Sequence, residues 1–304
     1  MLCILNHDAS RMDKNPPRND AEPRFRLHPV YRLGMLLAAG GTVTGALATD
    51  APDPAHAGHG PAGAIQLAQI GATEGEGEGE AGGEGTVMNS AAAYLAQLAL
   101  IRGHLDVGVD LYREGHTEAA VTHMKHPGHE LYAGLVPAFE ARGVDGFADA
   151  LETLATTVEE GGEREAVEAA YTAVREGITA AEAGVPAEER NDAIMQFRVI
   201  VRLMRTAAAE YAIAVVDGRM ENAHEYQDAL GFVRVARRMV DRLADDSEQT
   251  ARGGVNDAIA VARTQLDEIR DLWVGLVPPD TLDREPARLY GATARVELAA
   301  TAID

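Results

Sequence analysis

From residue 89 onward, apolar residues recur every three or four positions, and this spacing continues almost to the end of the chain. Such a period places apolar side chains along one face of an α-helix. The alternation of apolar and polar residues that indicates strands is nearly absent. The pattern therefore predicts an all-α body, built as up-and-down helical bundles of about nine helices that follow a disordered N-terminal region.

Capping residues, glycines and prolines divide this body into helices. Pro127 suits the first position of a helix, and Asp217-Gly218 is expected to turn the chain. The predicted helices cover about residues 91–114, 116–125, 127–141, 145–160, 163–183, 187–216, 223–244, 254–276 and 286–302.

The first residues of the chain lack the helical pattern and resemble a targeting segment. A basic stretch precedes the short apolar run Leu33–Ala48, and small residues follow it. This order is typical of a secretory signal, with cleavage expected after Ala48 or Ala57 and a periplasmic location for the product. An uncleaved anchor in the inner membrane is the alternative reading. The Gly/Glu run at 74–84 has no side chains to bury and repels itself, which predicts a disordered linker.

These observations predict four segments. Residues 1–57 form the signal or targeting segment, and 58–87 form the disordered acidic Gly/Glu linker. Residues 88–183 form a His-rich helical bundle, and 184–304 form a second helical bundle.

Composition excludes several classes of protein. The 304 residues carry a formal net charge of −21, which argues against a nucleic-acid partner, since nucleic acids bind clustered Lys and Arg. The single cysteine, Cys3, cannot form an intramolecular disulfide, a Cys-based zinc site or an iron–sulfur cluster. Nucleotide-binding glycine motifs, GxSxG and HExxH are missing from the sequence. We therefore do not expect an enzyme.

Histidines provide the strongest chemical signal. Five of the ten lie within 26 residues, at 104, 116, 123, 126 and 129. His123 and His126 are three residues apart, and Glu130 follows His126 by four, so a helix or a helix corner can aim all three toward one point. His104 lies on the preceding helix, which must pack antiparallel to a neighbour because the connections are short. We predict a metal site formed by His104, His123, His126 and Glu130.

Plainer interpretations stay open for these residues. His104 is equally consistent with a hydrogen-bonded core histidine, His116 with a helix start, and His129 with an exposed first turn. Asp106 and Asp110 lie on a different helical face from His104, which favours a solvated face. Iron is the expected metal. Zinc is an alternative, and so is copper, because Met124 adjoins the histidines.

Two stretches resemble a known family. In Glu210–Tyr226, a helix ends at Asp217-Gly218, and then Asn222 and the pair Glu225-Tyr226 open the next helix. This stretch resembles the extracytoplasmic N-terminal domain of bacterial high-affinity iron permeases. Residues 111–120, followed by 130–132, are loosely similar to a Tyr-x-x-Gly-Asp module of the same permeases and of imelysin-like periplasmic iron-uptake proteins.

The second stretch departs from the family pattern, because His116 stands where that module has Asp. The family's transport chemistry uses an Arg-Glu-Gly motif in membrane helices, whereas Arg175-Glu176-Gly177 here lies in an amphipathic segment. Permease activity is therefore not carried over. The resemblance implies an exported helical domain that binds or hands over iron. For Glu225, a structural role at the helix cap near Asn222 is expected ahead of a role as a ligand.

Three functions compete. The first is an exported metal-binding protein, whose partners are a metal ion and an inner-membrane metal transporter. The second is a helical adaptor without metal, which predicts scattered histidines and an exposed apolar groove. The third is a ferritin-like di-iron enzyme, which requires Glu-x-x-His pairs on two helices. Glu221-x-x-His224 is the only such match, so this third function is disfavoured.

Overall fold

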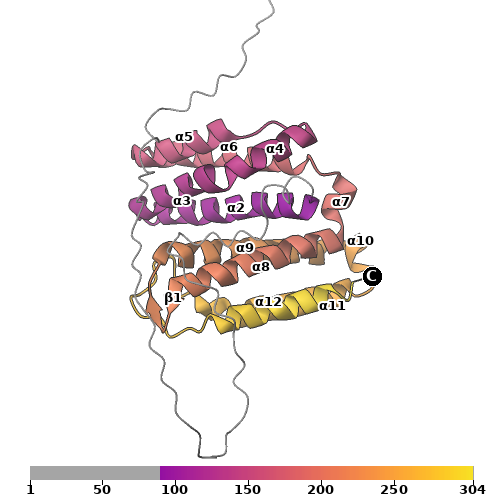
Figure 1. Ribbon diagram of the computed structural model, residues 1–304. Helices are drawn as coiled ribbons and strands as arrows, with labels where there is room; N and C mark the ends of the chain where they lie inside the picture. The colour runs from indigo at the N-terminus through magenta and orange to yellow at the C-terminus, as the bar shows by residue number, and fades with distance from the viewer. Residues whose placement is uncertain (1–89, 304) are drawn as a thin grey trace, which may run out of the picture. The chain divides into compact units, whose positions relative to one another are not determined.

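Helices make up most of the computed structural model, which describes residues 90–303 (Figure 1). The all-α prediction is confirmed. The predicted signal segment at 1–57, with its cleavage sites and its membrane-anchor alternative, lies outside the described residues, as does the predicted linker at 58–87. Among residues 90–303, none of the helices combines the length and the hydrophobicity of a membrane span.

Within residues 90–303 the structure has eleven α-helices, two more than the sequence pattern predicts. A 3₁₀ turn, η2 (Arg270–Leu272), follows α11, and two short antiparallel strands, β1 (Val215–Val216) and β2 (Arg219–Met220), flank the predicted turn at Asp217-Gly218. The α-helices are α2 (Ala91–Arg113), α3 (Thr117–Glu130), α4 (Tyr132–Arg142), α5 (Ala148–Glu159), α6 (Arg164–Glu182), α7 (Ala187–Asn191), α8 (Ala193–Ala214), α9 (Ala223–Asp245), α10 (Ser247–Thr250), α11 (Val255–Glu268) and α12 (Ala287–Ala300).

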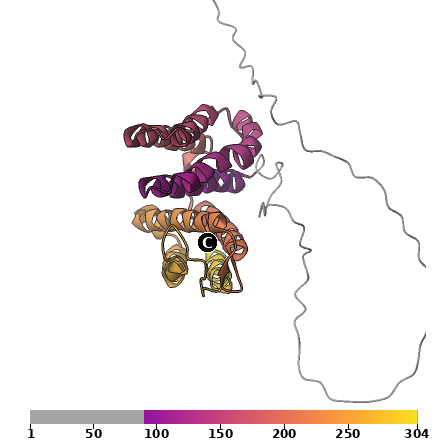
Figure 2. The same cartoon turned by 90° about the vertical axis from the view of Figure 1, so that its left-hand side faces the viewer.

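The helices stack in layers, which both views show (Figures 1 and 2). The layers run from α4, α5 and α6 through α2 and α3, then α8 and α9, to α11 and α12. Helix α2 packs against α3 and α6 on one side and against α8 and α9 on the other. One continuous apolar core runs through the described residues, which fall in a single compact unit. The predicted boundary between two bundles, at residue 184, falls between α6 and α7 in the chain. The division into two bundles stays a prediction.

Local capping explains the helix ends that the sequence predicts well. The Ser90 hydroxyl accepts a hydrogen bond from the backbone N–H of Ala93 at the start of α2. Asn222 does the same for α9, where its side chain accepts from the N–H groups of His224 and Glu225. Helices α2, α4 and α5 end at Gly115, Gly143 and Gly161, which all have positive φ.

The prediction that Pro127 starts a helix is wrong, because Pro127 lies inside α3. A proline in a helix interior loses one backbone hydrogen bond and costs about 3 kcal/mol. Here Pro127 is buried, as are Met124 and His123 on the same helix. Burial of this face in the core offsets the local cost, so tertiary packing overrides the sequence signal.

Two other predicted ranges also differ from the structure. The helix expected at 187–216 is divided at Asp192, because the Asp192 carboxylate caps a new helix by accepting from the N–H of Met195 at 3.1 Å. The helix expected at 254–276 ends at Glu268. The chain beyond it is held by Tyr226, whose hydroxyl donates to the carbonyl of Gly275 and accepts from the N–H of Val274.

Helices α2 and α9 approach closely at two glycines. A Cβ on Gly231 would lie 2.4 Å from the carbonyl oxygen of Gly103, and a Cβ on Gly103 would lie 2.7 Å from the Phe232 ring. Only glycine allows the two backbones to come this close. His104 adjoins Gly103 on α2, and Asp228 precedes Gly231 by about one turn on α9. The crossing therefore sets the distance between His104 and Asp228.

Replacing Gly231 with Ala is expected to lower the free energy of unfolding by about 1–3 kcal/mol, because the added methyl meets backbone atoms that cannot move aside. The matched control is Gly291→Ala in α12, where the nearest atom to a new Cβ is the flexible Arg295 guanidinium at 3.4 Å. That control is expected to gain about 0.5–1 kcal/mol from helix propensity. Chemical denaturation measures both. Equal effects of the two substitutions would contradict the close crossing.

Candidate metal centre

Four histidine rings gather where α2, α3 and α9 meet. His104 comes from α2, His123 and His126 come from α3, and His224 comes from α9. The ring centroids of His123 and His224 are 4.3 Å apart, those of His126 and His224 are 4.8 Å apart, and those of His104 and His126 are 5.1 Å apart. His104 and His123 are buried, so two of the four imidazoles are shielded from water.

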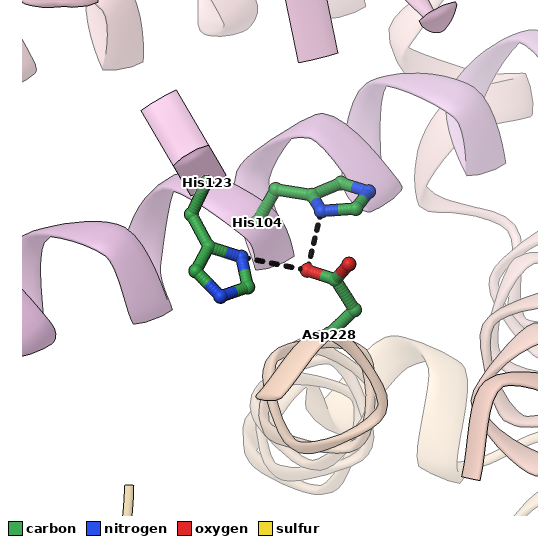
Figure 3. A group of neighbouring side chains, drawn as sticks. All are labelled: His104, His123 and Asp228. Carbon is green, nitrogen blue, oxygen red and sulfur yellow. Dashed lines mark hydrogen bonds and ion pairs between the residues drawn. The ribbon is translucent and has the colours of Figure 1, made fainter. Parts of the chain in front are cut away.

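The Asp228 carboxylate on α9 faces the rings of His104 and His123 (Figure 3). Its Oδ1 is 2.9 Å from Nδ1 of His123 and 2.5 Å from Nδ1 of His104. Its Oδ2 is 3.3 Å from Nδ1 of His224. Asp228 is only 1% exposed, and among the described residues its ion pairs are all with histidines. A buried carboxylate with these neighbours is a charge that needs a cation beside it.

Gln227 fixes the orientation of the His123 ring. The Gln227 Nε2 donates to the carbonyl of Leu276 at 2.9 Å, which leaves its Oε1 as an acceptor. That oxygen lies 2.8 Å from Nε2 of His123, so Nε2 carries a proton and donates to it. Nδ1 of His123 then faces Asp228. A histidine whose outer nitrogen is held this way presents the other nitrogen as a ligand.

Burial determines the charge states around Asp228. Burial lowers the pKa of His104 more than the nearby Asp228 carboxylate raises it, so this imidazole is neutral near pH 7. Burial also opposes ionisation of Asp228, but the electrostatic effect of the adjacent His104 and His123 and their hydrogen bonds lower its pKa far below the usual range. A neutral imidazole and an ionised carboxylate are the forms that bind metal.

The positions of the donor atoms fit a metal ion. One nitrogen each from His104 and His123 and one oxygen from Asp228 all lie within 4.8 Å of one another. Bonds of about 2.0–2.2 Å place neighbouring ligand atoms about 3 Å apart, which matches the His123–Asp228 distance and requires a slight lengthening for His104. Among the groups that the structure describes, Nδ1 of His104 and Oδ2 of Asp228 are buried without an aligned hydrogen bond. The donor set therefore fits a transition metal.

A second group of donors adjoins the first at the start of α9. His224, Glu225 and Asp228 each offer one ligand atom within 4.8 Å of the others. Nδ1 of His224 lies 3.9 Å from Oε1 of Glu225. The Asn222 side chain that caps α9 also donates to Glu225 at 3.4 Å, so the expected place of Glu225 at the helix cap agrees with the structure. Glu225 therefore lies both at the cap and beside the histidine cluster.

The structure brings some of the predicted metal ligands together. His104, His123 and His126 converge. The fourth predicted ligand, Glu130, ends α3, and its side chain lies outside the described residues, as does that of His129. His116 stands immediately before α3 with a side chain 43% exposed, which agrees with a helix start.

The expected solvated face agrees with Asp110, whose side chain is 36% exposed, but less well with Asp106, which is 15% exposed. Asp106 accepts a hydrogen bond from Tyr171 of α6 and pairs with Arg238 of α9. Asp110 pairs with Arg113 and Arg234, each at 3.0 Å. Both carboxylates therefore tie α2 to neighbouring helices through ion pairs.

The sequence pattern did not identify two residues near the start of α9 that lie in the centre of the site. His224 and Asp228 lie about one hundred residues beyond the histidine window, so a search for local clustering does not reach them. The available signal is their spacing, since residues four apart share a helix face. Glu221-x-x-His224 drew attention to His224 only as part of a different motif.

A cavity in the described part of the chain lies away from these residues. It has a volume of about 480 Å³ and is bounded by α2, α6, α7, α8 and α9, with Arg102, Arg238 and Arg242 in its lining. None of the clustered histidines lines this cavity. A metal ion needs donor atoms at bonding distance rather than a large void, so the cavity does not bear on the histidine centre.

Asp228→Asn is expected to lower the free energy of unfolding of the metal-free protein by about 2–4 kcal/mol, because it removes the charge that satisfies two buried imidazoles. Asp110→Asn is the matched control. Its ion pairs are over one third exposed, so the expected loss is below about 1 kcal/mol. Denaturation with a chelator present measures both losses. Similar small losses would mean that Asp228 is not the centre of a buried network.

Comparison with protein families finds a match in the second half of the chain. Residues 186–303, which span α7 to α12, match the family model of the iron permease-associated 4-helix bundle domain. Searches of curated proteins and of solved structures found no match. The four long helices of the matched segment, α8, α9, α11 and α12, form the bundle that this description names. The match relates this part of the chain to iron permeases.

Proposed function

We propose that this protein binds iron between α2, α3 and α9 and takes part in iron uptake alongside a membrane iron permease. The observation that carries the proposal is the burial of Asp228 among His104, His123 and His224. The match of residues 186–303 to an iron permease-associated domain supports iron as the metal. That domain is named for a transport system rather than for an enzyme, in keeping with a binding role.

The proposed site combines two parts of the chain. Asp228 and His224 belong to the segment that matches the permease-associated domain, whereas His104, His123 and His126 precede it. Residues 90–183 therefore add histidines to a bundle that supplies carboxylates. Iron binding would then connect α2 and α3 to α9 through bonds to one ion.

The donor set narrows the choice of metal. Imidazole nitrogens and carboxylate oxygens together suit iron, zinc or manganese. Met124, which kept copper open, is buried and packs against Gly108 of α2, where a Cβ would lie 3.3 Å from its Cε. Iron remains first because of the family match, with zinc and copper as the alternatives to exclude in competition experiments.

The proposed function takes place after export of the protein. A cleaved signal at 1–57 would release the body into the periplasm, where the partner would be an inner-membrane metal transporter. The acidic surface of the chain, with a formal net charge of −21, suits an approach by cations. The competing adaptor hypothesis predicts histidines scattered over the surface, whereas four of them gather around Asp228.

Anaerobic titration of the purified, metal-free full chain with Fe²⁺, followed by elemental analysis after dialysis, tests the proposal. We expect retained iron in the parent protein and a loss of affinity of roughly 100-fold or more in His123→Gln and in Asp228→Asn. His116→Gln is the control, because His116 is exposed and lies outside the cluster.

Iron that binds elsewhere on the chain is the same in every variant, so the difference between variants reports on the proposed site. Circular dichroism checks that each variant is folded. Zn²⁺ and Cu²⁺ competition then ranks the metals. A parent protein that retains no metal, or an Asp228→Asn variant that retains iron unchanged, would overturn the proposal.

A further inference from the structure

The two oxygens of Asp228 face different sets of ligands. Oδ1 lies against the Nδ1 atoms of His104 and His123, whereas Oδ2 lies 3.3 Å from Nδ1 of His224. Oδ2 is buried and makes no aligned hydrogen bond among the described groups. A single metal held by Oδ1 would leave Oδ2 directed at the imidazole of His224. This arrangement is that of a carboxylate placed between two cation positions.

A complete second set of donors stands on the Oδ2 side. His224, Glu225 and Asp228 offer ligand atoms within 4.8 Å of one another, as His104, His123 and Asp228 do on the other side. The two triads share only Asp228. The His126 ring lies between them, with centroids 5.1 Å from His104 and 4.8 Å from His224, so it can complete either set.

Carboxyl groups also gather around the second set of donors. Glu210 on α8 is 8% exposed and lies next to Glu225, which adjoins His224 on α9. Asp228 lies one turn further along the same helix. In the described part of the chain, the ion pairs of Glu225 and Asp228 involve histidines only. A second cation beside Glu225 would add positive charge to this group of carboxyl groups.

The two positions differ in exposure. The side chains of His104, His123 and Asp228 are 6%, 0% and 1% exposed. Those of His224 and Glu225 are 19% and 16% exposed. Metal held by the first set is closed off from solvent, whereas metal held by the second set is within reach of it. The second set therefore lies on the more solvent-exposed side of the centre.

We propose that this chain holds a pair of metal ions bridged by Asp228, with an inner position at His104 and His123 and an outer position at His224 and Glu225. The inference rests on the proposed function, because it extends the same centre. A bridging carboxylate holds two ions about 3.5–4 Å apart. The outer ion exchanges with solvent, and the inner ion is reached through it.

Counting bound Fe²⁺ in the folded full chain under anaerobic conditions tests the pair. Relative to the parent protein, Asp228→Asn is expected to lose two ions, and His224→Gln and Glu225→Gln are expected to lose one each while the remaining ion stays tightly bound. His116→Gln is the control and is expected to lose none. A chelator is expected to remove one ion from the parent protein much faster than the other.

Loading with Mn²⁺ gives an independent readout by electron paramagnetic resonance. The parent protein is expected to show a spin-coupled pair, and Glu225→Gln an isolated ion. Loss of a single ion in Asp228→Asn, with no loss in His224→Gln or Glu225→Gln, would overturn the pair and leave the single-ion function standing. No loss in any of the three variants would overturn both. Two ions without spin coupling would overturn the bridge.

Discussion

The contact of α2 with α9 at Gly103 and Gly231 is the constraint on which the candidate site depends. Backbones that meet this closely bring side chains beside the crossing, or one turn from it, within bonding distance. His104 and Asp228 occupy such positions, and their Nδ1 and Oδ1 atoms lie 2.5 Å apart. A larger residue at either glycine would separate the helices, and the imidazole would no longer reach the carboxylate.

Burying Asp228 among histidines costs free energy that an apolar core would avoid. Desolvation of a carboxylate is offset only by close positive charge or by hydrogen bonds, and here imidazoles supply both. The neutral form of His104, favoured by burial, leaves that compensation incomplete in the metal-free protein. A bound cation would complete it, so the cost of the network is consistent with a site selected for binding rather than for stability.

Much of the fold can be predicted from the sequence, because caps and glycines act locally. Ser90, Asn222 and Gly143 end or begin helices where their chemistry requires. Pro127 could not be predicted, because its place in α3 depends on burial against distant helices. The site divides in the same way. His123 and His126 are found from their spacing, whereas Asp228 becomes a neighbour only through the α2–α9 crossing.

A crystal structure of the iron-loaded chain, with anomalous diffraction recorded on both sides of the iron absorption edge, tests the central claim most directly. The account predicts an iron peak within about 2.0–2.2 Å of the His123 and Asp228 donor atoms, between α3 and α9. Iron located only on surface carboxylates, with the His123–Asp228 hydrogen bond intact, would contradict it.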